Sequence, residues 1–101
     1  MKSNSQKGKI TASPKRRRVC FEWHSPAGEV SVAGSFNGWN PEKAKLSRKG
    51  EKEWKRFVLL EPGTYEYLFV VDGEWKSDPD ANGAVPNPFG GVNSTLAVEA
   101  A

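Results

Sequence analysis

Hydrophobic and polar residues alternate in short stretches along most of the chain, with the period of two that is typical of β-strands. Turn signals rich in Gly, Pro, Asn and Asp separate these stretches. The predicted strands are 18–23, 29–35, 43–47, 54–60, 64–71, a short return at 74–75, and 93–98. We expect a polar connection at 48–53 and irregular chain from 76 to 92. About seven antiparallel strands with no helical window predict an all-β fold, a two-sheet sandwich.

The longest alternating stretch, 64–71, ends in Asp72-Gly73, which favours a two-residue hairpin turn. With these two residues in the loop, Val70 lies opposite Trp75, and cross-strand partners share a face of the sheet. Trp75 is therefore expected on an outer face close to Leu68. The residues of the strand on this outer face are Glu66, Leu68 and Val70. The residues expected to face the core are Tyr65, Tyr67, Phe69 and Val71.

Another of the four Trp residues is predicted on a surface turn. A predicted strand runs into Asn37-Gly38, two residues that tolerate positive φ, and Trp39 follows, directly before Asn40-Pro41. A large aromatic side chain on a turn either meets a ligand or folds back over a small core. The turn alone leaves both interpretations open. Trp23 and Trp54 lie within alternating strands and are expected in the core.

Basic residues are concentrated at the start of the chain. Residues 1–18 contain seven of the 15 Lys and Arg residues and none of the 12 Asp and Glu residues, which leaves the rest of the chain with a net charge of −4. Residues 1–17 have almost no apolar side chains and are expected to be a disordered basic tail. Residues 18–101 are expected to form one domain. Because the domain itself is acidic, we do not expect it to bind nucleic acid.

The sequence contains few features expected of a membrane-spanning segment, a metal site or a catalytic site. No apolar run is long enough to span a membrane, and the N-terminus lacks the apolar segment of a standard secretion signal, so we expect a cytoplasmic protein. The single cysteine, Cys20, excludes an internal disulfide and a cysteine-based zinc site. His24 is the only histidine, and Asp78-Pro79-Asp80 lacks the spacing of a calcium loop. We therefore expect no enzyme activity, no metal and no cofactor.

The remaining candidate chemistry is a pair of exposed tryptophans, Trp39 and Trp75, with amides and a Gly-rich loop nearby. A pyranose ring has an apolar C–H face and a rim of hydroxyl groups. An indole ring matches the apolar face, and amide side chains can form hydrogen bonds with the hydroxyl groups. The sequence thus favours carbohydrate binding.

Four segments also carry a resemblance to a known family: Val32–Trp39, Gly63–Trp75, Asp78-Pro79 and Gly91–Ser94. In this order they resemble carbohydrate-binding module family 48. Its best-known members are the glycogen-binding domain in the β subunit of AMP-activated protein kinase and the N-terminal domains of branching and debranching enzymes. The resemblance covers about residues 18–99.

This resemblance implies an immunoglobulin-like β-sandwich that binds α-1,4-glucans such as glycogen, starch or maltooligosaccharides. It places Trp39 and Trp75 on the two stacking tryptophans of the family. Asn93 falls on an asparagine that forms hydrogen bonds with sugar hydroxyls, and Phe89 on an apolar loop residue that presses into the curved glucan.

Two positions of the expected site depart from the family. Leu68 stands where glycogen-binding members carry a lysine that donates to the sugar, and Gly91 stands where a threonine contributes. The resemblance implies an α-glucan polysaccharide or oligosaccharide as the ligand, with a glucan-metabolising enzyme or a kinase as a partner protein.

Two other interpretations stay open. The first is a structural or protein-interaction domain of the same fold that binds no sugar, since many family members chiefly pack against a catalytic domain. The second is a basic-tail adaptor to nucleic acid or to an anionic membrane, and a strong salt dependence of binding would support it.

Overall fold

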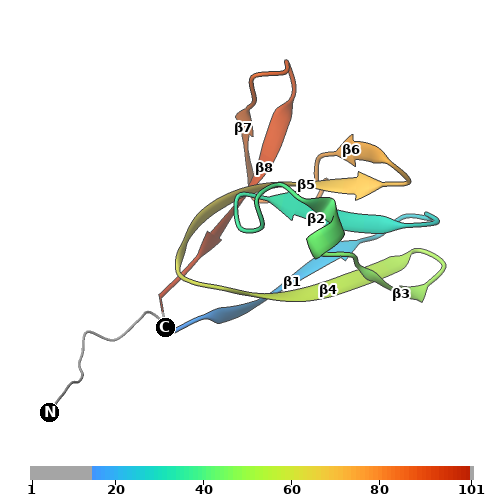
Figure 1. Cartoon of the computed structure of the whole chain (residues 1–101), viewed down its shortest axis with the longest axis horizontal. Helices are drawn as coiled ribbons and strands as arrows, with labels where there is room; N and C mark the ends of the chain where they lie inside the picture. The colour runs from blue at the N-terminus through green and yellow to red at the C-terminus, as the bar shows by residue number, and fades with distance from the viewer. Residues whose placement is uncertain (1–14, 101) are drawn as a thin grey trace, which may run out of the picture.

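Residues 15–100, which the computed structural model describes, form two antiparallel β-sheets that pack against each other (Figure 1). The strands are β1 (Arg17–Trp23), β2 (Val30–Gly34), β3 (Ser47–Gly50), β4 (Glu53–Leu60), β5 (Gly63–Val71), β6 (Glu74–Lys76), β7 (Gly83–Pro86) and β8 (Val92–Val98). A short 3₁₀-helix, η1, spans Pro41–Lys43. The predicted all-β sandwich is confirmed.

Strand β5 lies at the centre of the larger sheet. The smaller sheet has the strand order β1-β4-β3, and the larger has the order β2-β5-β8-β7, with β6 also paired to β5. One edge of β5 pairs with β2. The other edge is shared between β8, at Gly63–Tyr67, and β6, at Phe69–Val71. In Figure 1, β7 and β8 project as a hairpin beyond the rest of the sandwich.

Aromatic rings fill much of the space between the sheets. Trp23 of β1 lies opposite Trp54 of β4, and both are buried. The Trp23 ring meets the Phe69 ring edge-on at a centroid distance of 5.3 Å, and Phe69 meets Tyr67 at 5.9 Å. Such rings contribute large buried apolar areas. The prediction that Trp23 and Trp54 belong to the core is confirmed, as is the inward face of β5.

The predicted register of the β5–β6 hairpin is also confirmed, with Val70 opposite Trp75. Asp72 adopts a left-handed φ of 50° in the turn, a conformation that Asp tolerates better than most residues. Its Oδ1 accepts hydrogen bonds from the backbone N–H groups of Gly28, at 2.9 Å, and Glu29, at 2.8 Å. The turn is therefore connected to the segment between β1 and β2.

The predicted strand at 43–47 is wrong. Lys43 is instead the last residue of η1, Pro41–Lys43. The next residues pair with the edge of β2, because Ala44 accepts from Val32 N–H at 2.9 Å and Leu46 N–H donates to Val30 at 2.8 Å. Only an isolated bridge results, because the chain leaves the larger sheet here for the smaller one.

The polar connection predicted at 48–53 is shorter than expected. Strand β3 occupies Ser47–Gly50 and β4 begins at Glu53, so only two residues, Glu51 and Lys52, join them. The alternation of hydrophobic and polar residues does not reveal β3, because all four of its residues are exposed and none is hydrophobic.

The segment predicted to be irregular contains strand β7. Its residues, Gly83–Pro86, form a strand because they pair with Val92–Thr95 of β8. Residues 1–14 lie outside the described part of the chain, so the disordered tail stays a prediction there, but its predicted end at residue 17 is wrong, because Arg17 already belongs to β1 and pairs with Leu60. Within residues 15–100, no helix is long and apolar enough to cross a membrane.

We expect Trp54→Ala to lower the free energy of unfolding by about 3–5 kcal/mol, because it truncates a large core side chain. Trp54→Phe should cost clearly less, since the buried indole Nε1–H of Trp54 has no hydrogen-bond partner within the described residues. Denaturant unfolding of the two variants measures both losses. Equal losses would contradict this account of the core.

Candidate functional site

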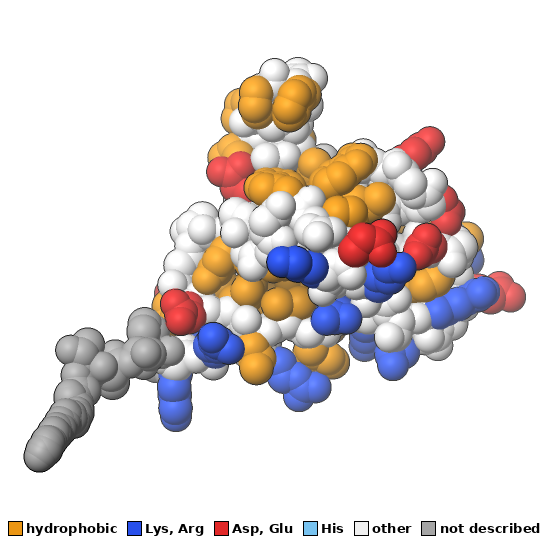
Figure 2. All heavy atoms as spheres, in the orientation of Figure 1, with side chains coloured by type: hydrophobic (Ala, Val, Ile, Leu, Met, Phe, Trp, Pro, Cys, Tyr) orange, Lys and Arg blue, Asp and Glu red, His pale blue; other side chains and the backbone are white. Residues whose placement is uncertain are grey.

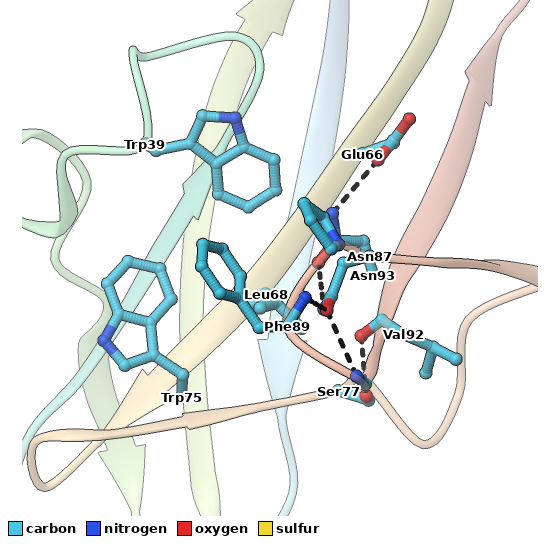
Figure 3. Close-up of a pocket in the computed structure, with 11 residues that line it drawn as sticks. Trp39, Glu66, Leu68, Trp75, Ser77, Asn87, Phe89, Val92 and Asn93 are labelled. Atoms are coloured by element: carbon cyan, nitrogen blue, oxygen red, sulfur yellow. Dashed lines mark hydrogen bonds between the residues drawn. The ribbon is translucent and has the colours of Figure 1, made fainter.

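A cleft of about 810 Å³ lies against the outer face of the larger sheet (Figure 3). All six residues expected to bind carbohydrate line it, although they come from distant parts of the chain. The complete lining is Trp39, Glu66, Leu68, Trp75, Ser77, Asn87, Pro88, Phe89, Gly91, Val92 and Asn93. The structure thus brings the predicted site residues together, and their role in binding stays a prediction.

The turn after β2 places Trp39 at the cleft. Asn37 Oδ1 accepts a hydrogen bond from Gly34 N–H at 3.0 Å, and its Nδ2 donates to the Val32 carbonyl at 3.2 Å. Trp39 N–H donates to the Gly34 carbonyl at 3.0 Å. Gly38 and Trp39 both have positive φ, of 68° and 59°. This conformation is uncommon for a bulky residue, and strained residues of this kind cluster at functional sites.

Gly34 allows this turn to lie close to β5. A Cβ atom at Gly34 would lie 2.5 Å from the Glu66 carbonyl oxygen and 2.6 Å from the Phe36 ring, so a larger residue would separate the turn from the strand. Two contacts use the close approach, since Ser35 N–H donates to the Glu66 carbonyl and Glu66 N–H donates to Ser35 Oγ. The position of Trp39 therefore depends on β5.

The β5–β6 hairpin places Trp75 on the same side. Its side chain is 49% exposed, and it shares the outer face with half-buried Leu68, as the register predicts. In Figure 3 the rings of Trp39 and Trp75 stand on one side of the cleft, with Leu68 deeper between the two sides. Trp39 is half-buried, lines the cleft and is not among the described residues that form the core or pack against it, so the structure disfavours a lid on the core, and a role in ligand binding stays a prediction.

The loop between β7 and β8 forms the opposite side. Phe89, at its tip, is 94% exposed. Figure 2 shows hydrophobic side chains gathered on this hairpin and on the surface below it. Exposed apolar groups in one area indicate an interaction site.

Amide and carboxylate groups continue this side of the cleft. Asn93 is almost fully buried, with 9% exposure. Its Nδ2 donates to Glu66 Oε1 at 3.0 Å, and its Oδ1 accepts from Asn87 Nδ2 at 3.2 Å. The Asn93 side chain is therefore restrained in one orientation, which is typical of a residue that forms specific hydrogen bonds.

The segment after β6 is connected to the sheet below the cleft. Tyr67 Oη donates to Asp78 Oδ2 at 2.6 Å, and Asp78 N–H donates to Ser94 Oγ at 2.9 Å. Burial, with the neighbouring Asp78 carboxylate, raises the pKa of Tyr67 far above its usual range, so the phenol stays protonated as a donor. Asp78 thus has a structural partner, and the Asp-Pro-Asp segment forms part of the support of the site.

Sequence reasoning missed five residues of the lining: Glu66, Ser77, Asn87, Pro88 and Val92. Glu66 could have been found, because the alternation of β5 already places it on the face of Leu68. Asn87 carries a weaker signal, an Asn before Pro in a Gly-rich loop, which favours a turn closed by the Asn side chain. The contacts of Ser77 and Val92 depend on the tertiary fold, where Ser77 Oγ donates to the Val92 carbonyl at 3.4 Å.

The arrangement suits recognition of a neutral ring better than catalysis. The two tryptophan rings form one side, and Phe89 with the amide groups forms the other. Glu66 is the single charged residue of the lining. His24 lies elsewhere, between Glu22 and Glu53 at 3.0 Å from each, and the hydrogen bond to Glu53 raises its pKa. Within residues 15–100 no group of three His, Cys, Asp or Glu residues is placed to ligate a metal.

Comparison with known proteins gives a family match over nearly all of the described chain. The model of the family described as the glycogen recognition site of AMP-activated protein kinase matches residues 17–101.

Curated relatives include plant and animal proteins. The chain is 40% identical over 63 residues to Protein FLOURY ENDOSPERM 6, chloroplastic, of rice, covering 62% of this chain and 12% of the relative. It is 38% identical over 63 residues to Protein PTST homolog 2, chloroplastic, of Arabidopsis thaliana, with the same coverage. It is 34% identical over 88 residues to the β-1 subunit of pig 5′-AMP-activated protein kinase, covering 87% of this chain and 69% of the relative.

The fold also matches a solved enzyme structure. A maltogenic amylase from S. marinus superposes with a TM-score of 0.65 and 25% sequence identity, over 89% of this chain and 15% of the enzyme. The chain therefore corresponds to a small part of that enzyme and of the plant relatives.

We expect Trp75→Ala to lower the free energy of unfolding by only about 1 kcal/mol, as for an ordinary substitution outside the core. The reason is that half of its surface is exposed on the cleft. Denaturant unfolding measures the loss, with Trp54→Ala as the matched core variant. A loss of about 3 kcal/mol or more for Trp75→Ala would show that its ring supports the core.

Proposed function

Because this chain belongs to the family of the glycogen recognition site of AMP-activated protein kinase, within carbohydrate-binding module family 48, we propose that it is a non-catalytic module that binds α-1,4-glucans. The observation that carries the proposal is that Trp39 and Trp75 line one cleft, opposite a row of restrained amide groups. Glycogen, starch and maltooligosaccharides are the ligands of this class.

In this proposal the glucan is recognised by stacking on one side of the cleft and by hydrogen bonds on the other. The apolar faces of successive glucose rings stack on Trp39 and Trp75, where the indole rings remove apolar C–H groups from water. Asn93 and Glu66 supply polar atoms for the sugar hydroxyls on the other side. Phe89 extends from its loop and fits the concave side of a curved glucan chain. Leu68 adds an apolar contact at the base of the cleft.

The proposed biological role is to bring a partner to a glucan. Similarity to a subunit of a kinase supports a kinase complex as that partner, and the match to part of an amylase supports a glucan-metabolising enzyme. The proposal does not require a membrane or nucleic acid. The two plant relatives are named as chloroplastic proteins. The cytoplasmic location expected from the sequence therefore stays a prediction.

A second candidate function is protein interaction without sugar binding. It is favoured by the outer face of the smaller sheet, where Phe57 is 50% exposed and Leu59 59% exposed. The Arg18 guanidinium lies over the Phe57 ring at 3.8 Å, a cation–π contact on the surface. This face and the cleft belong to different sheets, so substitutions can test them separately.

We expect titration calorimetry with maltoheptaose to give a dissociation constant between about 1 μM and 1 mM, equivalent to about −8 to −4 kcal/mol. Trp39→Ala and Trp75→Ala should each weaken binding by about 2 kcal/mol, roughly thirtyfold, because each removes a stacking surface.

Phe57→Ala is the matched control for these two variants, because it removes an exposed aromatic ring from the other sheet. It should leave the affinity for maltoheptaose unchanged. Absence of heat and of NMR shift changes at millimolar maltoheptaose in the unsubstituted protein would reject glucan binding and favour the second candidate function.

We expect Leu68→Lys to strengthen glucan binding a few-fold. A charged donor to a sugar hydroxyl contributes about 1.5–3 kcal/mol when well formed, and fixing the lysine side chain costs up to about 2 kcal/mol. The expected net gain is therefore about 0.5–1 kcal/mol, measured by maltoheptaose titration.

Leu68→Met is the control for this variant, because it changes shape without adding a donor and should leave affinity nearly unchanged. The melting temperature of both variants should stay close to that of the unsubstituted protein. A large fall for Leu68→Lys would mean that Leu68 supports the core or a protein interface.

A further inference from the structure

Asn87 forms an unusual set of hydrogen bonds with its own loop. Its side-chain Oδ1 accepts from the backbone N–H groups of Phe89, at 2.9 Å, and Gly91, at 3.1 Å. Its backbone carbonyl accepts from Gly90 N–H at 3.4 Å, and its own N–H donates to the Gly91 carbonyl at 2.9 Å. Since Pro88 has no N–H group, every backbone donor from 88 to 91 bonds to this one residue.

The position of Phe89 depends on these bonds. A side chain that is 94% exposed gains almost no restraint from packing. Gly90 adopts a left-handed φ of 87°, a conformation that glycine permits in a tight turn. Such a turn needs hydrogen bonds that hold its ends together. The side chain of Asn87 provides that closure, and it thereby presents the Phe89 ring toward the cleft.

The same side chain also orients the Asn93 amide. Asn87 Nδ2 donates to Asn93 Oδ1 at 3.2 Å, which directs Asn93 Nδ2 toward Glu66 Oε1 at 3.0 Å. If position 87 offered only an acceptor, Asn93 would have acceptors on both sides. In either orientation of its amide, the Asn93 oxygen would then face another acceptor, that of residue 87 or the Glu66 carboxylate. The Asn87 Nδ2 donor therefore orients Asn93, and the Oδ1 acceptor closes the loop.

We propose that Asn87 is the positioning residue of the glucan cleft: it fixes the loop that presents Phe89 and selects the orientation of the Asn93 amide. The inference rests on the proposed function, since the groups that it positions are those expected to meet the glucan. A positioned loop loses less conformational freedom on binding, which raises affinity without a new contact.

Hydrogen exchange without sugar tests the loop itself. In the unsubstituted protein the amide protons of Phe89 and Gly91 should be protected, and Asn87→Ala should abolish that protection. Asn87→Asp should retain it, because its carboxyl group still offers an acceptor. The control is Asn82→Ala, an exposed asparagine outside the cleft lining, which should change neither amide. Equal protection in Asn87→Ala and in the unsubstituted protein would overturn the proposal.

A double-mutant cycle then tests the link to binding. Asn87→Ala should weaken maltoheptaose binding about three- to tenfold, and Phe89→Ala about tenfold. If Asn87 acts through Phe89, the double variant should lose much less than the product of the two factors. Losses that multiply would overturn the action of Asn87 through Phe89, and an unchanged affinity in Asn87→Ala would overturn the whole proposal.

Acidification of Asn87→Asp tests the orientation of Asn93. At pH 7 the new carboxylate has no proton to donate to Asn93 Oδ1, so affinity should be reduced although the loop stays protected. Near pH 4, close to the ordinary pKa of about 3.9 for an Asp carboxyl group, protonation restores a donor and the affinity should recover relative to Asn87→Ala. A pH profile parallel to that of Asn87→Ala would overturn the role in orienting Asn93.

These measurements separate the two proposals. Protected loop amides in a protein that binds no maltoheptaose would reject glucan binding itself, and with it the role of Asn87 in affinity. Maltoheptaose binding that is indifferent to Asn87→Ala would reject only the positioning role.

Discussion

Strand β5 pairs with neighbours along both edges, and its side chains point alternately to the core and to the cleft. Tyr67 and Phe69 are buried between the sheets, while Glu66 and Leu68 line the cleft. A slip of one residue in register would exchange the two faces. The packing that stabilises the core therefore also fixes the base of the cleft, and it fixes Trp75 through the paired hairpin strand.

The sides of the cleft come from turns, and polar side chains shape those turns. Asn37 closes the turn that carries Trp39, Asp72 connects the hairpin that carries Trp75, and Asn87 closes the loop that carries Phe89. Each of these side chains accepts hydrogen bonds from backbone N–H groups that regular strands would otherwise pair. As a result, these aromatic rings keep defined positions at the cleft, where about half of the surface of Trp75 and most of that of Phe89 stays exposed.

The distribution of charge agrees with recognition of a neutral ligand. The cleft lining contains one carboxylate and no Lys or Arg, so stacking and hydrogen bonds to neutral groups would dominate binding and would depend little on salt. The exposed Phe57 and Leu59 lie on the other sheet. A glucan in the cleft and a protein on that second face would therefore not compete for the same residues.

Alternation and turn chemistry were enough to predict much of the fold and part of the site. The strands around Trp23 and Trp54, and the register that follows from Asp72-Gly73, depend on neighbours in sequence, so the pattern alone determined which faces they occupy. Strand β7 has no such pattern and exists because β8 offers its edge. The link from the Asn87 loop to the sheet is likewise a tertiary result, since the Asn87 side chain donates a hydrogen bond to Asn93, and Asn93 in turn donates to Glu66, 27 residues away from Asn93 in sequence. Local propensity cannot encode a hydrogen bond whose partner only folding brings near.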